Sequence, residues 1–160
     1  MSDQPRRELA TFAAGCFWDL EAVFRRQNGI LATIAGYTGG TVPDPDYGQV
    51  ASGTTGHAEA VRVVFDPDLV TYDALLDLFW SSHDPTEPAG GSERSAIFYH
   101  SPKQRAKALA SRDRLQESFG TKVITTEILP AQEFWKAEEC HQQYYEKCGR
   151  GYSTEPKYWE

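Results

Sequence analysis

One cysteine near the start of the chain, Cys16, stands where a strand-like segment leads into an amphipathic one. The apolar segment 9–14 precedes it, and the aromatic pair Phe17 and Trp18 follows it. A thiol at the first turn of a helix lies against unpaired N–H groups and the positive end of the helix dipole, which favours the thiolate. Two aromatic faces beside the sulfur suit a small apolar group such as a methyl. The pattern therefore predicts a nucleophilic thiol with an apolar pocket.

Groups that can move protons lie further along the chain. Glu59 supplies a carboxyl, and such a group acts as an acid when a partly apolar site keeps it neutral. Tyr47 supplies a neutral hydroxyl donor that can stabilise charge developing on an oxygen. We expect His57 to orient its loop by hydrogen bonds rather than to serve Cys16 as a base. The other motifs of mixed polar and small residues are 36–40, 55–59, 83–86, 94–97 and 137–144.

The elements that position these residues follow from hydrophobic periodicity and from caps. Strands are predicted at about 8–14, 30–37, 58–65, 95–99 and 123–129. Helices are predicted at about 17–27, 72–82, 102–119 and 134–147, with a long loop over 38–55. Thr71 and Ser101 are the expected caps, and His83 is expected to cap a helix end. The order βαββαβ followed by αβα predicts an α/β (α+β) two-layer sandwich with a split βαβ, ferredoxin-like core plus a C-terminal helix and tail, in a single domain over residues 1–160.

Composition limits the classes of function. The net charge of -7 argues against a general nucleic-acid or membrane-surface role, because either would require a basic face. No apolar run has the length of a membrane span, and the start of the chain has no signal-peptide core, so we expect a cytoplasmic protein. We also expect it to be a monomer. Three widely spaced cysteines without C-x-x-C spacing indicate thiol chemistry rather than a disulfide framework or a metal site.

In their order and register, these motifs resemble the peptide methionine sulfoxide reductases of the A type (MsrA). The resemblance covers nearly the whole chain, from about residue 9 to 152. It implies an oxidoreductase of protein repair under oxidative stress, which reduces the S epimer of methionine sulfoxide, free or in proteins. It further implies that no metal or organic cofactor is needed and that a thioredoxin-like reductant restores the redox-active cysteine.

The resemblance also implies a role for each candidate residue. Cys16 corresponds to the nucleophile, and Phe17 and Trp18 to the pocket for the methyl group of the substrate. Glu59 corresponds to the acid that protonates the sulfoxide oxygen. Tyr47 corresponds to a hydroxyl donor to that same oxygen. Attack on sulfur would leave a sulfenic acid on the cysteine, which condenses readily with a second thiol.

Two features depart from the family pattern. The loop 87–93 is shorter than usual and lacks the Asp and Tyr that family members carry there, although Glu87 or Glu93 offers a carboxyl in place of the Asp. The resolving cysteine that often follows Gly-Tyr is replaced, because Ser153 stands at that position.

Cys140 and Cys148 are therefore the candidates for the resolving thiol. On one predicted helix they would lie roughly 12 Å apart along the axis and would not bridge each other. Cys148 is predicted to link to Cys16, because the helix should fray beside Gly149. Cys140 is the alternative, and it is expected to be a buried small hydrophobe in the middle of the helix.

Two other functions compete with sulfoxide reduction. A thiol peroxidase or an acyl transferase would also use a cysteine, although acyl transfer favours a Cys-His pair over a cysteine with an acid. A module that binds methionine sulfoxide with weak or lost turnover would keep the aromatic pocket despite the short loop. Turnover with a thioredoxin system separates these alternatives.

Overall fold

The computed structural model describes residues 6–88 and 90–152. Its strands are β1 (Glu8–Ala13), β2 (Ile30–Thr38), β3 (Ala58–Phe65), β4 (Ala96–Tyr99), β5 (Glu127–Pro130) and β6 (Phe134–Lys136). Its helices are α1 (Phe17–Arg25), α2 (Tyr47–Ala51), α3 (Tyr72–Ser81), α4 (Pro102–Ser118) and α5 (Tyr144–Tyr152), with a 3-10 turn η1 (Glu139–His141). The strands form one sheet in the order β5-β4-β1-β3-β2-β6.

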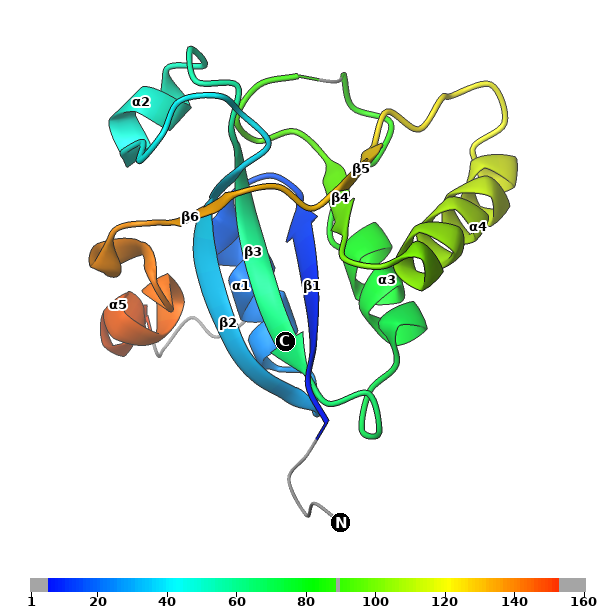
Figure 1. The fold of residues 1–160 in the computed structure, drawn as a ribbon, viewed down its shortest axis with the longest axis horizontal. Helices are drawn as coiled ribbons and strands as arrows, with labels where there is room; N and C mark the ends of the chain where they lie inside the picture. The colour runs from blue at the N-terminus through cyan, green and yellow to red at the C-terminus, as the bar shows by residue number, and fades with distance from the viewer. Residues whose placement is uncertain (1–5, 89, 153–160) are drawn as a thin grey trace.

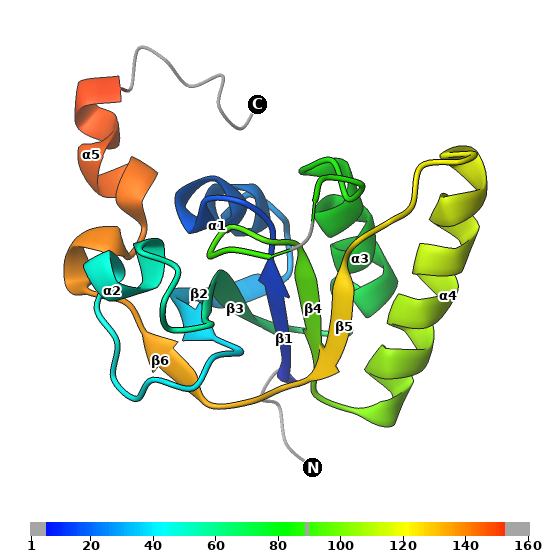
Figure 2. The same cartoon turned by 90° about the horizontal axis from the view of Figure 1, so that it is seen from above.

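The four central strands and two helices make the split βαβ core that the sequence predicts. Strand β3 lies between β1 and β2 and is antiparallel to both, while β4 flanks the other side of β1. Helices α1, α3 and α4 lie on one face of the sheet, and the connection from β5 to β6 crosses the other face (Figures 1 and 2). The ring of Phe12 stacks on Phe24 and Phe79 in the layer between sheet and helices, where all three side chains are buried.

The predicted helix caps are confirmed. The hydroxyl of Thr71 accepts a hydrogen bond from the N–H of Ala74, and that of Ser101 accepts one from the N–H of Gln104. The long loop 38–55 contains a helix, α2, that the sequence analysis did not predict. Asp46 and Gln49 form a capping box at its start, which stabilises a helix too short to form alone.

The predicted helix over 134–147 is wrong. Its first part is strand β6, which pairs with β2, and it is followed by the turn η1 and by α5. The amide of Gln142 accepts from the N–H of Ala35 and donates to its carbonyl oxygen, so it occupies the free edge of β2. Gln143 has a left-handed backbone (φ 48), which separates η1 from α5. Tertiary hydrogen bonds at a sheet edge therefore override the local helical pattern.

The fifth predicted strand is shorter than expected. Strand β5 begins only at Glu127, because the preceding residues bond to the loop after α3 and to α4 instead of to the sheet. The N–H of Thr125 donates to the carbonyl of Pro85, and the N–H of Ile124 donates to the amide oxygen of Gln116. The chain over 123–126 therefore anchors the loop that follows α3.

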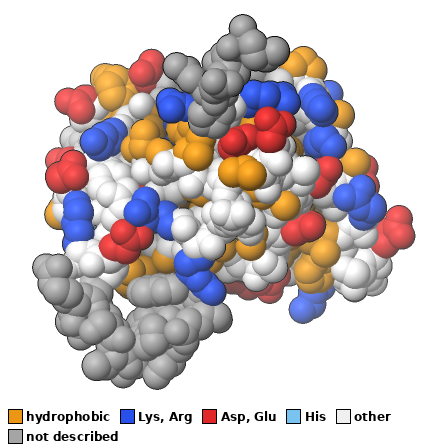
Figure 3. Space-filling view, turned by 90° about the horizontal axis from the view of Figure 1, so that it is seen from below, with side chains coloured by type: hydrophobic (Ala, Val, Ile, Leu, Met, Phe, Trp, Pro, Cys, Tyr) orange, Lys and Arg blue, Asp and Glu red, His pale blue; other side chains and the backbone are white. Residues whose placement is uncertain are grey.

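Helix α1 starts at the end of the sheet where β1 ends and β3 begins. Figure 3 shows the opposite end of the molecule, where acidic and basic side chains are interspersed with hydrophobic ones and no charge of one sign dominates. No helix within residues 6–88 and 90–152 is long and apolar enough to cross a membrane.

Strand β6 reaches β2 only because residue 36 has no side chain. A Cβ on Gly36 would lie 2.4 Å from Cε1 of Phe134 and 2.5 Å from the carbonyl oxygen of Trp135. We therefore expect Gly36→Ala to lower the free energy of unfolding by about 1–3 kcal/mol, as overpacking does. Gly48→Ala is the matched control, because a Cβ there would meet only Oδ1 of Asp46 at 3.5 Å. Equal stability of the two variants in urea titrations would contradict the close approach.

Candidate active site

Cys16 is the N-cap residue of α1, and its side chain is half-buried. Burial raises the pKa of the Cys16 thiol to about 11, and the nearby Glu59 carboxylate also raises it. Hydrogen bonds from the backbone N–H groups of Trp18 and Asp19 lower the pKa but do not compensate. The prediction that the helix N-terminus favours the thiolate is therefore wrong for the unliganded site, because desolvation outweighs the helix N–H groups.

Glu59 lies on β3 beside the start of α1. Its side chain is only 2% exposed, and its Oε1 accepts a hydrogen bond of 3.2 Å from the N–H of Phe17, the residue after the cysteine. Burial raises the pKa of Glu59 to about 7, against the effect of that N–H group. At neutral pH this carboxyl is therefore ready both to hold and to release a proton.

Tyr47 is the first residue of α2, and Glu138 joins it to the sheet. The carboxylate of Glu138 accepts from the backbone N–H of Tyr47 at 2.9 Å through Oε2 and from the hydroxyl of Tyr37 at 2.7 Å through Oε1. Tyr37 pairs with Glu59 in the β2–β3 ladder. Burial and the charge of Glu59 raise the pKa of Tyr47, so its hydroxyl remains a neutral donor.

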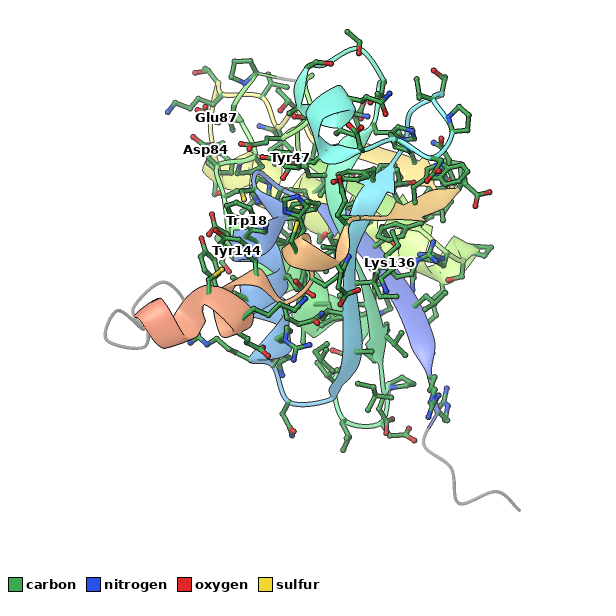
Figure 4. The ribbon with its side chains drawn as sticks, turned by 90° about the vertical axis from the view of Figure 1, so that its left-hand side faces the viewer. Trp18, Tyr47, Asp84, Glu87, Lys136 and Tyr144 are labelled. Atoms are coloured by element: carbon green, nitrogen blue, oxygen red, sulfur yellow. The ribbon has the colours of Figure 1, made fainter. Side chains whose placement is uncertain are left out.

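The two residues predicted to form the aromatic pocket, Phe17 and Trp18, lie in a cluster of aromatic rings at the start of α1. Phe17 is buried, with its ring 5.7 Å from that of Tyr37 and 5.5 Å from that of His141. The indole N–H of Trp18 donates to Nδ1 of His141 at 3.0 Å. Tyr144 stacks on Trp18 with ring centroids 3.7 Å apart, and Figure 4 shows this pair below Tyr47.

The short loop after α3 closes another side of the site. The N–H of Gly15 donates to the carbonyl of Glu93, and the N–H of Glu59 donates to that of Ser92. Arg94 holds the loop in this position, because its guanidinium donates to the carbonyls of Gly56 and Gly91 and pairs with a glutamate of β5. A cleft of about 520 Å³ lies between this loop, the turn before Cys16 and the end of α2, and Asp84 and Glu87 lie at its rim (Figure 4).

Two histidines act as the sequence predicts. Nδ1 of His57 accepts from the N–H of Gly40, and its Nε2 donates to the carbonyl of Val42, so His57 orients the loop after β2. Nδ1 of His83 donates to the carbonyl of Phe79 near the end of α3.

The two remaining cysteines occupy different elements. Cys140 lies exposed on η1, and Cys148 lies half-buried on α5. The expectation of a buried Cys140 in the middle of a helix is therefore wrong, as is the single helix carrying both thiols. Cys148 is therefore not distinguished from Cys140 by its place on a shared helix, and the contacts of α5 distinguish the two thiols instead.

Three residues of the site had no role assigned from the sequence: Tyr37, Glu138 and His141. All three lie in motifs that the sequence analysis noted, 36–40 and 137–144. The available signal was that Glu138 lies three residues before His141. Because this region was predicted as a helix, the place of the two side chains in the site could not be derived. Within the described residues, no three His, Cys, Asp or Glu side chains gather to hold a metal ion.

The arrangement combines a nucleophilic sulfur, a carboxyl poised near neutrality, a phenol donor and an aromatic wall. Such a site can attack a polarised, weakly basic oxide that carries a small apolar group.

Comparison with known proteins gives the same chemistry. The family model "Peptide methionine sulfoxide reductase" matches residues 8–157. The chain is 53% identical over 149 residues to a peptide methionine sulfoxide reductase MsrA of Methanosarcina mazei, covering 89% of this chain and 71% of that protein. The crystal structure of reduced Mxr1 from Saccharomyces cerevisiae superposes with a TM-score of 0.83 at 31% identity, covering 95% of this chain and 94% of that one. Mxr1 in complex with Trx2 superposes with a TM-score of 0.65 at 29% identity, covering 90% and 89%.

Proposed function

The chain belongs to the peptide methionine sulfoxide reductase family, and we propose that it reduces methionine-S-sulfoxide through Cys16, with Glu59 as the acid. The observation that carries this assignment is the buried carboxyl of Glu59, bonded to the N–H that follows the nucleophile. A sulfoxide oxygen is a poor leaving group until it is protonated, so the acid must lie beside the sulfur.

The first step uses the thiol's own proton. The pKa of about 11 for Cys16 and of about 7 for Glu59 mean that a single proton is shared by the pair above neutral pH. The carboxylate of Glu59 takes the proton from Cys16 and then delivers it to the sulfoxide oxygen. The thiolate attacks the sulfoxide sulfur, and the oxygen passes to the cysteine. Cys–SH and R₂S=O become Cys–SOH and R₂S, so the cysteine sulfur is oxidised and the substrate sulfur is reduced.

The other site residues recognise the reacting group. Phe17 and Trp18 provide apolar faces for the methyl of the sulfoxide. The hydroxyl of Tyr47 donates to the oxygen as negative charge develops there. The loop 87–93 lacks the Asp and Tyr of the family pattern. Glu93 does not replace either of them as a buried donor, because its side chain is exposed.

The second stage restores the thiol. A resolving cysteine attacks the sulfenic acid of Cys16, which releases water and forms a disulfide. Cys148 lies four residues after Tyr144 on α5, so the two share a helix face, and Tyr144 contacts Trp18 next to the site. This placement supports Cys148 as the resolving thiol, with Cys140 as the alternative. The yeast complex of Mxr1 with Trx2 supports a thioredoxin-like protein as the reductant.

The remaining assignments rest on the sequence. We propose a single domain over residues 1–160, acting as a monomer. Free thiols are maintained in a reducing compartment, which supports the cytoplasm.

A thioredoxin-coupled assay on methionine-S-sulfoxide tests the function. We expect turnover by the wild-type protein and none by Cys16→Ser, because a hydroxyl forms no comparable anion at neutral pH. Circular dichroism checks that the variant is folded. Turnover by folded Cys16→Ser would exclude the mechanism, and substrate binding by the wild-type protein without turnover would indicate a binding module.

The shared proton predicts a pH dependence for the first turnover. The active form has the proton on Glu59 and none on Cys16. Below the Glu59 pKa of about 7 both groups are protonated, so the single-turnover rate should rise about tenfold per pH unit to about pH 7 and then level. Glu59→Gln should slow this step by about 10²–10⁴-fold at neutral pH and move the rise to higher pH, because the Cys16 thiol must then lose its proton to solvent. Glu93→Gln is the control for charge near the site, and an equal loss there would assign the acid to Glu93.

The disulfide formed by substrate distinguishes the two candidate thiols. We expect a Cys16–Cys148 link after one turnover without reductant, because α5 carries Cys148 on the face that contacts α1. Peptide mapping by mass spectrometry identifies the link. A Cys16–Cys140 link, or a persistent sulfenic acid without any link, would show that Cys148 is not the resolving thiol.

A further inference from the structure

We propose that Glu138 and His141 are positioning residues that hold the two halves of the substrate site, Glu138 through Tyr47 and His141 through Trp18. This inference rests on the proposed function of the same site and assigns its supporting residues. Neither side chain needs to touch the substrate to act in this way.

Glu138 fixes the donor half of the site. Both of its carboxylate oxygens are used, one by the hydroxyl of Tyr37 at 2.7 Å and the other by the N–H of Tyr47 at 2.9 Å. The first of these donors belongs to β2, opposite Glu59, whereas the second begins α2. The carboxylate therefore ties the short helix that carries the Tyr47 hydroxyl to the strand beside the acid.

His141 fixes the apolar half. Its Nδ1 accepts the indole N–H of Trp18 at 3.0 Å, so its ring proton lies on Nε2. The same ring stacks on Tyr47 with centroids 4.6 Å apart and lies 5.5 Å from the ring of Phe17. The side chain is 9% exposed. His141 thus holds the indole of Trp18 by a hydrogen bond and the phenol ring of Tyr47 by stacking.

The 3-10 turn η1 explains how one short segment serves both halves. A 3-10 helix has 3.0 residues per turn, so Glu138, its N-cap, and His141 project to the same side. Glu138, Glu139 and Cys140 are exposed, whereas His141 is buried. The turn itself is held in place by the pairing of β6 with β2 and by the amide of Gln142 on Ala35. The turn η1 therefore positions both Trp18 and Tyr47, which are far apart in the sequence.

A double-mutant cycle on the first turnover separates positioning from a general loss of stability. We expect Tyr47→Phe to lower the maximal single-turnover rate by about 10²-fold and Glu138→Ala to lower it by about 10-fold or more. If Glu138 acts through the Tyr47 hydroxyl, the double variant should be within about threefold of Tyr47→Phe alone. Multiplied effects in the double variant would overturn the role of Glu138. Glu138→Gln, which keeps an acceptor oxygen, should recover most of the rate.

His141→Phe tests the apolar half. The phenyl ring can still stack on Tyr47 but cannot accept the indole N–H of Trp18. We expect about a tenfold rise in the methionine-S-sulfoxide concentration that gives half the maximal single-turnover rate, with the maximal rate nearly unchanged. A fall in the maximal rate without a rise in that concentration would overturn the role of His141.

Glu139→Gln is the matched control, because it removes the neighbouring carboxylate of the same turn, which pairs only with exposed lysines among the described residues. The maximal single-turnover rate and the methionine-S-sulfoxide concentration that gives half of it should both stay at wild-type values. A loss equal to that of Glu138→Ala would mean that charge on the turn, rather than the bridge to Tyr47, controls the rate. Absence of reduction by the wild-type protein would instead overturn the proposed function, and this inference with it.

Discussion

The hydrogen bond from the backbone N–H of Phe17 to the buried carboxyl of Glu59 is the constraint around which the site is built. It joins the first turn of α1 to β3 and places an acid one residue from the nucleophile. A carboxyl only 2% exposed would be costly without a donor, and a helix N-terminus offers N–H groups that lack partners within the helix. The same burial raises the pKa of both the acid and the thiol. One proton is therefore shared by two groups that each resist ionisation.

In the proposed mechanism, this shared proton protects the thiol when substrate is absent. A thiolate reacts with peroxides and disulfides, whereas a protonated thiol reacts slowly. The pKa of Cys16 at about 11 keeps the sulfur protonated at rest, despite its position at a helix N-terminus. The anion is formed only by proton transfer to Glu59, and a sulfoxide oxygen within reach of that acid draws the proton onward. Reactivity is thereby linked to the substrate that the site is shaped to receive.

The central fold and most of the chemistry could be predicted from the sequence because each depends on patterns among neighbouring residues. The apolar segment of β1, the alternation in the sequence of β3, the helical spacing in α1 and the caps at Thr71 and Ser101 each appear within a few residues. The region after residue 130 could not be predicted in this way. Its helical spacing is overridden by pairing with the edge of β2, which depends on the absence of a side chain at Gly36. The supporting residues of the site lie in that region, so Glu138 and His141 received no role.

The contacts that hold Gln143, just before α5, differ from those that hold α5 itself, and this difference bears on the recycling step. On its inner side, the N–H and amide of Gln143 donate to the carboxylate of Glu21, which is buried and also accepts from Thr33. Beyond that residue, α5 is held by stacking of Tyr144 on Trp18, by a hydrogen bond from the hydroxyl of Tyr145 to Asp19, and by exposed ion pairs of Glu146 with Arg25 and of Lys147 with Glu139. Exposed ion pairs contribute about 0–1 kcal/mol, much less than a buried carboxylate left without its donors would cost. In the proposed recycling step, the segment that carries Cys148 moves more easily than the turn that positions the pocket, because most of its polar contacts are exposed, and the resolving thiol must approach a half-buried sulfur.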